Sequence, residues 1–241
     1  MRNPILNNKF MSQETVIEGE PLTINGTIQK TFCLFLILLL GASYTWSLFA
    51  KGFLAEVMTY SMVAGFVALL TALIIIFGRV IFLIPVYALA EGVLLGSLSA
   101  LAEAQYPGIV FNAVLGTFGA LFSMLFLYRM KLITCTEKFK SVVFISTTTI
   151  FLIYILDLVG SFFGYKVPFL YDCGVVGIAA SLIIIIVAAL NLIIDFDFIE
   201  KGAQNLIPKK FEWFGAFGLL VTLVWLYIEI LKLLSKLNSR R

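Results

Sequence analysis

The chain of 241 residues contains no histidine, and only 13% of its residues are charged. The absence of histidine excludes Ser-His hydrolases, histidine-ligated zinc or haem, and a histidine pH switch. Cysteine is also scarce: Cys33, Cys135 and Cys173 lie far apart and form no CxxC pair, so they indicate no metal or redox motif. Soluble domains carry about 25% charged and less than about 50% apolar residues. Because 61% of this chain is hydrophobic, the composition predicts an integral membrane protein.

Seven apolar runs are long enough to cross a bilayer, which requires roughly 20 residues. They cover about residues 31–50, 57–78, 80–101, 107–128, 141–164, 174–195 and 213–235. The runs show no strict alternation, which favours helices over barrel strands. We therefore expect an all-α integral membrane protein, a seven-transmembrane-helix bundle. In this division residues 1–30 form a polar N-terminal segment, residues 31–236 the helical domain and residues 237–241 a basic tail.

Basic residues in the connections predict the orientation of these spans. If the N-terminus is cytoplasmic, the connections on that side hold eight Lys and Arg residues against two on the other side. The eight are Arg79, Arg129, Lys131, Lys138, Lys140, Lys201, Lys209 and Lys210, and the two are Lys51 and Lys166. We expect a cytoplasmic N-terminus, although the basic C-terminal tail argues against seven spans in this orientation.

Five carboxylates within or at the ends of the apolar runs are the main candidate functional residues. They are Glu91, Asp157, Asp195, Asp197 and Glu229, with Asp195 and Asp197 closing the sixth run. A charged acid at the bilayer centre costs roughly 2.5–3.5 kcal/mol, and we expect no Lys or Arg deep enough in the runs to neutralise these acids. Unpaired carboxylates can take up a proton or bind a cation, which points to proton or cation traffic. The alternative is that each acid is protonated and hydrogen-bonded between helices as a structural element.

Other polar features carry less information. Gly92 and Gly96 are four residues apart, a spacing that allows close helix packing beside Glu91. Glu200 and Glu212 lie near a connection, where we expect solvated surface. Tyr171-Asp172 is similar to one motif of intramembrane aspartyl proteases, but the partner Gly-x-Gly-Asp is missing. No phosphate loop or nucleophile elbow is present, so we expect no enzyme, no cofactor and no nucleic-acid partner.

Several stretches along nearly the whole chain resemble the Bax inhibitor-1-like, or transmembrane Bax-inhibitor-motif, family, most closely a bacterial branch. They are Asn3-Pro4, TINGT (23–27), AEGVLLGSLSA (90–100), YPGIVFNAVLGTF (106–118), ALNLIIDFDFIEKG (189–202) and FEWFGAFGLLVTLVWLYIEILKLL (211–234). The resemblance implies seven helices with the last one central, and a pH-sensitive calcium leak across a membrane. It implies that two aspartates, on the sixth and seventh helices, share a proton and act as the sensor. The bacterial branch further suggests the plasma membrane.

The family pattern can be carried over only in part. Asp195, followed by Ile199 and Gly202, matches the sixth-helix aspartate, and Glu91-Gly92 matches a third-helix pair. The seventh-helix aspartate has two possible matches, Glu229 or Val221. If the turn centres near residue 206, Asp195 and Glu229 differ in depth by roughly 18 Å, which favours Val221 and leaves that position without an acid. Asp197 or Glu91 could then partner Asp195.

Three functional hypotheses follow. The first is a pH-sensitive calcium leak channel in which Asp195, Asp197 and Glu91 line or gate the path, Asp195 binds calcium transiently, and Glu229 and Asp157 are secondary. The second is a non-conducting regulator that binds another membrane protein, such as a protease, through residues 1–30. The third is a proton-coupled transporter of a small solute, because acids alone do not distinguish a channel from a carrier.

Overall fold

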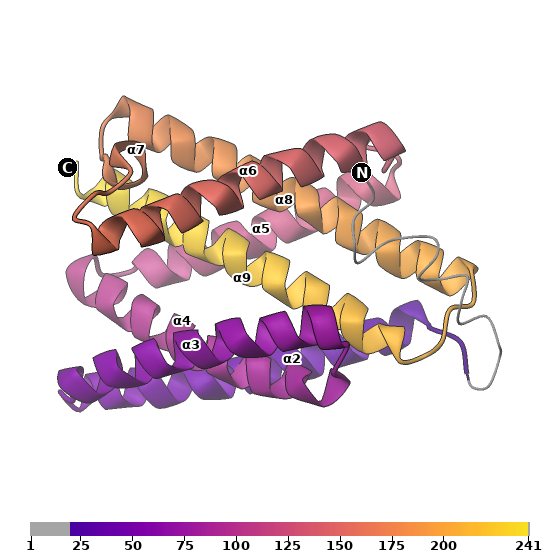
Figure 1. Ribbon diagram of the computed structural model, residues 1–241, viewed down its shortest axis with the longest axis horizontal. Helices are drawn as coiled ribbons and strands as arrows, with labels where there is room; N and C mark the ends of the chain where they lie inside the picture. Colours follow the sequence, from indigo (N-terminus) through magenta and orange to yellow (C-terminus); the bar gives the residue numbers. More distant parts are fainter. Residues whose placement is uncertain (1–19, 241) are drawn as a thin grey trace. The chain divides into compact units, whose positions relative to one another are not determined.

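The computed structural model describes residues 20–240, which form mainly α-helices (Figure 1). In chain order they are α2 (Ile24–Ala50), α3 (Leu54–Gly78), the 3-10 turn η1 (Ile81–Leu83), α4 (Ile84–Gln105), α5 (Ile109–Arg129), α6 (Glu137–Phe162), α7 (Pro168–Tyr171), α8 (Val175–Gln204) and α9 (Phe211–Asn238). Within the described residues, seven helical stretches are long and apolar enough to cross a membrane, which confirms the seven predicted spans. Residues 1–19 and Arg241, and with them most of the predicted N-terminal segment, lie outside the described residues.

Two helices extend well beyond the apolar runs that predicted them. Helix α2 begins at Ile24 because the Thr23 side chain caps it by accepting a hydrogen bond from the Gly26 amide at 3.0 Å. Helix α8 continues nine residues past Asp195, to Gln204. Asp195 and Asp197 close the apolar run but lie within the helix, since charged side chains can end an apolar run without ending a helix.

The chain divides into two compact units, and α8 and α9 each contribute to both. The first unit consists of residues 20–105 and 197–221, and the second of residues 106–196 and 222–240.

In the first unit, α4 packs against α2 and α3 (Figure 1). The α2–α4 contact depends on glycine, because a Cβ atom on Gly92 would overlap the backbone of Leu38, and one on Gly96 would overlap Thr45. Thr45 also donates a hydrogen bond to the Val93 carbonyl at 3.2 Å. The two helices thus approach to backbone contact, as small residues four apart allow.

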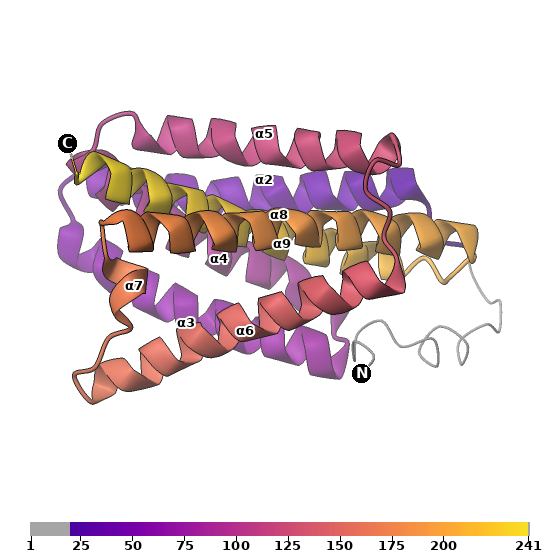
Figure 2. The ribbon, with the colours of Figure 1, turned by 90° about the horizontal axis from the view of Figure 1, so that it is seen from above.

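In the second unit, polar side chains join α8 to two neighbours. Asn191 of α8 donates to the Thr147 hydroxyl of α6 at 2.8 Å. Lys236 of α9 donates to Ser181 of α8 at 2.9 Å. The short helix α7 lies in the connection between α6 and α8 (Figure 2).

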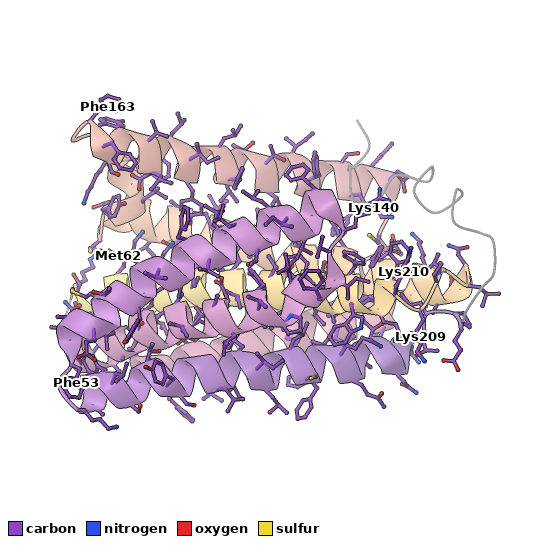
Figure 3. The ribbon with its side chains drawn as sticks, turned by 60° about the horizontal axis from the view of Figure 1, so that its bottom comes forward. Phe53, Met62, Lys140, Phe163, Lys209 and Lys210 are labelled. Carbon is purple, nitrogen blue, oxygen red and sulfur yellow. The ribbon has the colours of Figure 1, made fainter. Side chains whose placement is uncertain are left out.

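The outward faces of the helices carry large apolar side chains. Met62 of α3 is 77% exposed and Phe163, after α6, is 85% exposed (Figure 3). Such faces would be unfavourable in water but suit contact with lipid. A surrounding bilayer would therefore cover the apolar surface of each unit.

Candidate functional site

Asp195, on α8, is the acid that matches the sixth-helix aspartate of the family pattern, and its side chain is partly buried. Its Oδ2 atom is buried and forms no hydrogen bond within residues 20–240. The neighbouring side chains on α8, Leu192 and Ile193, are fully buried. Thr222 of α9, itself buried, lies within hydrogen-bonding reach of Asp195. The second unit therefore holds a carboxyl group in an apolar setting with one hydroxyl beside it.

Glu91 has a similar environment in the first unit. It is 8% exposed on α4, and the Tyr87 hydroxyl, one helical turn earlier, lies within hydrogen-bonding reach of its carboxyl group. The Tyr87 ring packs edge-on against Phe217 of α9 with ring centroids 5.0 Å apart. Gly92 and Gly96, next along α4, hold this part of the helix against α2.

The expectation that no base neutralises the acids is wrong for Asp197 and Glu229. Asp197 forms an ion pair with Lys201, one turn further along α8, at 2.8 Å. Glu229 forms an ion pair with Lys232 at 3.0 Å and accepts a hydrogen bond from Tyr154 at 2.8 Å. In both cases the lysine follows the acid by three or four residues on the same helix and has a half-exposed side chain. Long lysine side chains can reach back in this way while the charge stays near water.

Asp157 and Asp172 form local contacts within the second unit. Asp157, at the end of α6, accepts hydrogen bonds from the Val167 amide and the Tyr171 hydroxyl. Asp172 accepts from the backbone amides of Gly174 and Gly177 ahead of and within the first turn of α8, and these two bonds lower the pKa of its carboxyl group. Both aspartates thus hold the connection between α6 and α8.

Glu212 was expected to be solvated surface, and this expectation is wrong: it is the most buried acid among the described residues, with 0% exposure. Its carboxylate accepts hydrogen bonds from both the amide and the hydroxyl of Thr23 at 2.9 Å, and forms an ion pair with Lys30. Thr23 is the N-cap residue of α2. The first turn of α9 therefore caps the first turn of α2.

The arrangement replaces a capping box, in which a Glu or Gln three residues after the N-cap accepts from the N-cap amide. Here the third residue is Gly26, and a Cβ atom on it would overlap the Glu212 carboxylate. The sequence feature that marks this arrangement is therefore a capping threonine, Thr23, followed three residues later by glycine where a capping box has Glu or Gln. The missing acid is supplied 189 residues along the chain, which a reading of local sequence does not reveal.

The position opposite Asp195 on α9 is occupied by Thr222, one residue after Val221. Glu229 lies seven residues further along, about 10 Å along the helix axis, and contacts Tyr154 and Lys232 instead. Asp197 follows Asp195 by two residues, so the two side chains leave α8 on different faces. Within the described residues no group of three or more Cys, Asp and Glu side chains is placed to hold a metal ion.

The seven apolar helices define a multi-pass membrane protein. The family model described as Bax inhibitor 1 like matches residues 3–239, nearly the whole chain, and the chain belongs to that family. This confirms the resemblance seen in the sequence, and the family is consistent with a channel-like role in a membrane. No match was found among curated proteins or among solved structures.

Proposed function

We propose that this protein is a pH-sensitive cation leak channel, with calcium as the permeant ion and Asp195 as the group that changes protonation state. The observation that carries the proposal is the buried Asp195 Oδ2 atom, which has no hydrogen-bond partner within residues 20–240. A charged carboxylate in such a place is costly unless a proton or a cation accompanies it. Membership of the Bax inhibitor 1 like family supports a channel-like role.

The acids fall into two groups according to whether a lysine or a hydroxyl group lies beside the carboxyl group. Asp197, Glu212 and Glu229 each pair with a lysine, whose ammonium group only donates hydrogen bonds and so favours the charged carboxylate. Asp195 and Glu91 instead lie beside hydroxyl groups, those of Thr222 and Tyr87. A hydroxyl can donate to a carboxylate or accept from a carboxylic acid. Asp195 and Glu91 therefore can gain or lose a proton without losing their hydrogen-bonding partners.

The proposed sensor uses one carboxyl group where the family resemblance implies two. Thr222 takes the place beside Asp195, and the Asp197 charge is held by Lys201. When Asp195 is charged, its open Oδ2 atom offers an oxygen ligand of the kind calcium prefers. Protonation removes that ligand and closes the path. Glu91 is proposed as a second, independent carboxyl group along the ion path in its own unit.

Several properties of the protein belong to the same proposal. We place it in the plasma membrane with the N-terminus in the cytoplasm, as the eight-to-two distribution of basic residues in the connections favours. The proposed activity is ion movement, with no chemical reaction and no cofactor. The lipid bilayer, calcium and protons are its partners in this account.

Reconstitution of the full chain in liposomes that contain a calcium-sensitive dye tests the proposal. Calcium should enter faster at about pH 8 than at about pH 6, since the carboxyl group is more often charged at the higher pH. Liposomes that stay silent throughout this range would contradict a leak channel. Silent liposomes together with a stoichiometric partner crosslinked through residues 1–30 in native membranes would support the non-conducting regulator instead. Proton flux that depends on an added small solute would support the transporter.

A further inference from the structure

The first unit has an open groove where α3 turns into α4. Its volume is about 570 Å³, and it is lined by Arg79, Val80, Ile81, Phe82, Pro85 and Trp213. Arg79 adopts a left-handed backbone conformation, with φ of 56°, that ends α3. The 3-10 turn η1 follows and leads into α4. The helix interruption therefore creates a recess with one cationic residue and five apolar ones.

The groove lies at an end of a membrane-spanning helix. Helix α3 has 25 residues, which corresponds to about 37 Å and exceeds the roughly 30 Å hydrocarbon core of a bilayer. Residues just beyond its ends therefore reach the polar headgroup regions. Trp213 in the groove wall is the residue type enriched at this depth.

The charges around the groove are predominantly positive. Arg79 is part of its lining, and Lys210 lies three residues before Trp213 in the turn that leads into α9 (Figure 3). The acid next to the groove, Glu212, is enclosed by Lys30 and Thr23, so its charge is compensated. The Lys30 ammonium also lies 5.5 Å from the centre of the Trp213 ring.

We propose that this groove binds an anionic phospholipid of the phosphatidylglycerol type. Apolar side chains next to an arginine match the two parts of such a lipid, an acyl chain and a phosphate. The guanidinium group of Arg79 suits phosphate because its planar N–H donors can bind two phosphate oxygens at once. A zwitterionic lipid carries a compensating ammonium group and gains less from the positive surroundings. The site is separate from Asp195 and does not depend on the proposed channel activity.

The full chain is incorporated into nanodiscs that contain equal amounts of phosphatidylglycerol and phosphatidylcholine, released from them, and measured by native mass spectrometry. The wild-type chain should retain more phosphatidylglycerol than phosphatidylcholine. Arg79→Gln should lower the retained phosphatidylglycerol about fivefold, as expected for one basic residue near a membrane surface. Lys51→Gln is the matched control, because it removes one exposed positive charge at the other end of α3, and it should leave retention unchanged.

A second variant keeps the test independent of any effect of Arg79 on folding. Phe82 is 77% exposed, so Phe82→Ala removes part of the apolar wall without disturbing the core. It should lower retention of phosphatidylglycerol while every charge stays in place. Equal retention of the two lipids by the wild-type chain would overturn the proposal. An equal loss of retained phosphatidylglycerol in Arg79→Gln and Lys51→Gln would also overturn it. Unchanged retention of phosphatidylglycerol in Phe82→Ala would do the same.

Discussion

Glu212, in the first turn of α9, accepts hydrogen bonds from the amide and the hydroxyl of Thr23, the N-cap residue of α2, both at 2.9 Å. Two further contacts join the same segments, since the Leu22 amide donates to the Ile207 carbonyl at 2.8 Å and Lys209 pairs with Glu20. The start of the first membrane helix is thereby fixed to the turn between the last two.

Removal of this cap should destabilise the fold. Glu212→Ala leaves the Thr23 amide without its acceptor and the partly buried Lys30 without its counter-ion. We expect the free energy of unfolding to fall by about 2–3 kcal/mol. The loss is no larger because the Lys30 ammonium group remains partly solvated after its counter-ion is removed. Equilibrium unfolding in detergent measures the change. Glu56→Ala, which truncates an exposed acid in the first turn of α3, should change stability by less than about 0.5 kcal/mol, and an equal effect of both variants would argue against the cap.

Gly26→Ala should be destabilising although alanine is the better helix former by about 1 kcal/mol. The added methyl group would overlap the Glu212 carboxylate and displace it from Thr23. A double-mutant cycle with Glu212→Ala measures the coupling. In the Glu212→Ala background the same substitution should become neutral or stabilising. Gly119→Ala, where a methyl group meets no atom within 4 Å, is the control, and similar effects of Gly26→Ala in both backgrounds would contradict the explanation.

The close contact of α2 and α4 should make Gly92 intolerant of any side chain. A methyl group there would overlap the Leu38 backbone, so Gly92→Ala must push the two helices apart. We expect this to lower the free energy of unfolding by about 1–3 kcal/mol. On α3, Gly65→Ala would place its methyl group 3.8 Å from Leu94, an ordinary contact. Thermal unfolding of the two variants should show a lower midpoint for Gly92→Ala alone.

The number of spans and their type follow directly from the sequence, because a bilayer requires long apolar helices and little else satisfies the backbone there. The pairing of the acids does not follow in the same way. Asp197 and Glu229 each form an ion pair with a lysine of the next helical turn, a local spacing that is visible in the sequence. Glu212 finds its partners 182 and 189 residues away, and only the fold brings those segments together.

The orientation of the chain can be tested with its own cysteines. Cys135 lies in the connection between α5 and α6, which we place in the cytoplasm, and Cys173 lies just before α8, on the opposite side. In intact cells, a membrane-impermeant maleimide should label a variant that retains only Cys173. A variant that retains only Cys135 should react only after the membrane is opened. Labelling of Cys135 alone in intact cells would reverse the proposed orientation.

The proposed role of Asp195 is tested most directly by comparing two isosteric substitutions on the same helix. Asp195→Asn and Asp197→Asn each remove one carboxylate, but Asp197 is paired with Lys201 whereas Asp195 Oδ2 is buried without a partner in the described part of the chain. The measurement is calcium flux into dye-loaded liposomes at about pH 6 and pH 8. We predict that Asp195→Asn abolishes the difference in flux between the two pH values and that Asp197→Asn preserves it. A pH-dependent flux that persists in Asp195→Asn would contradict the account.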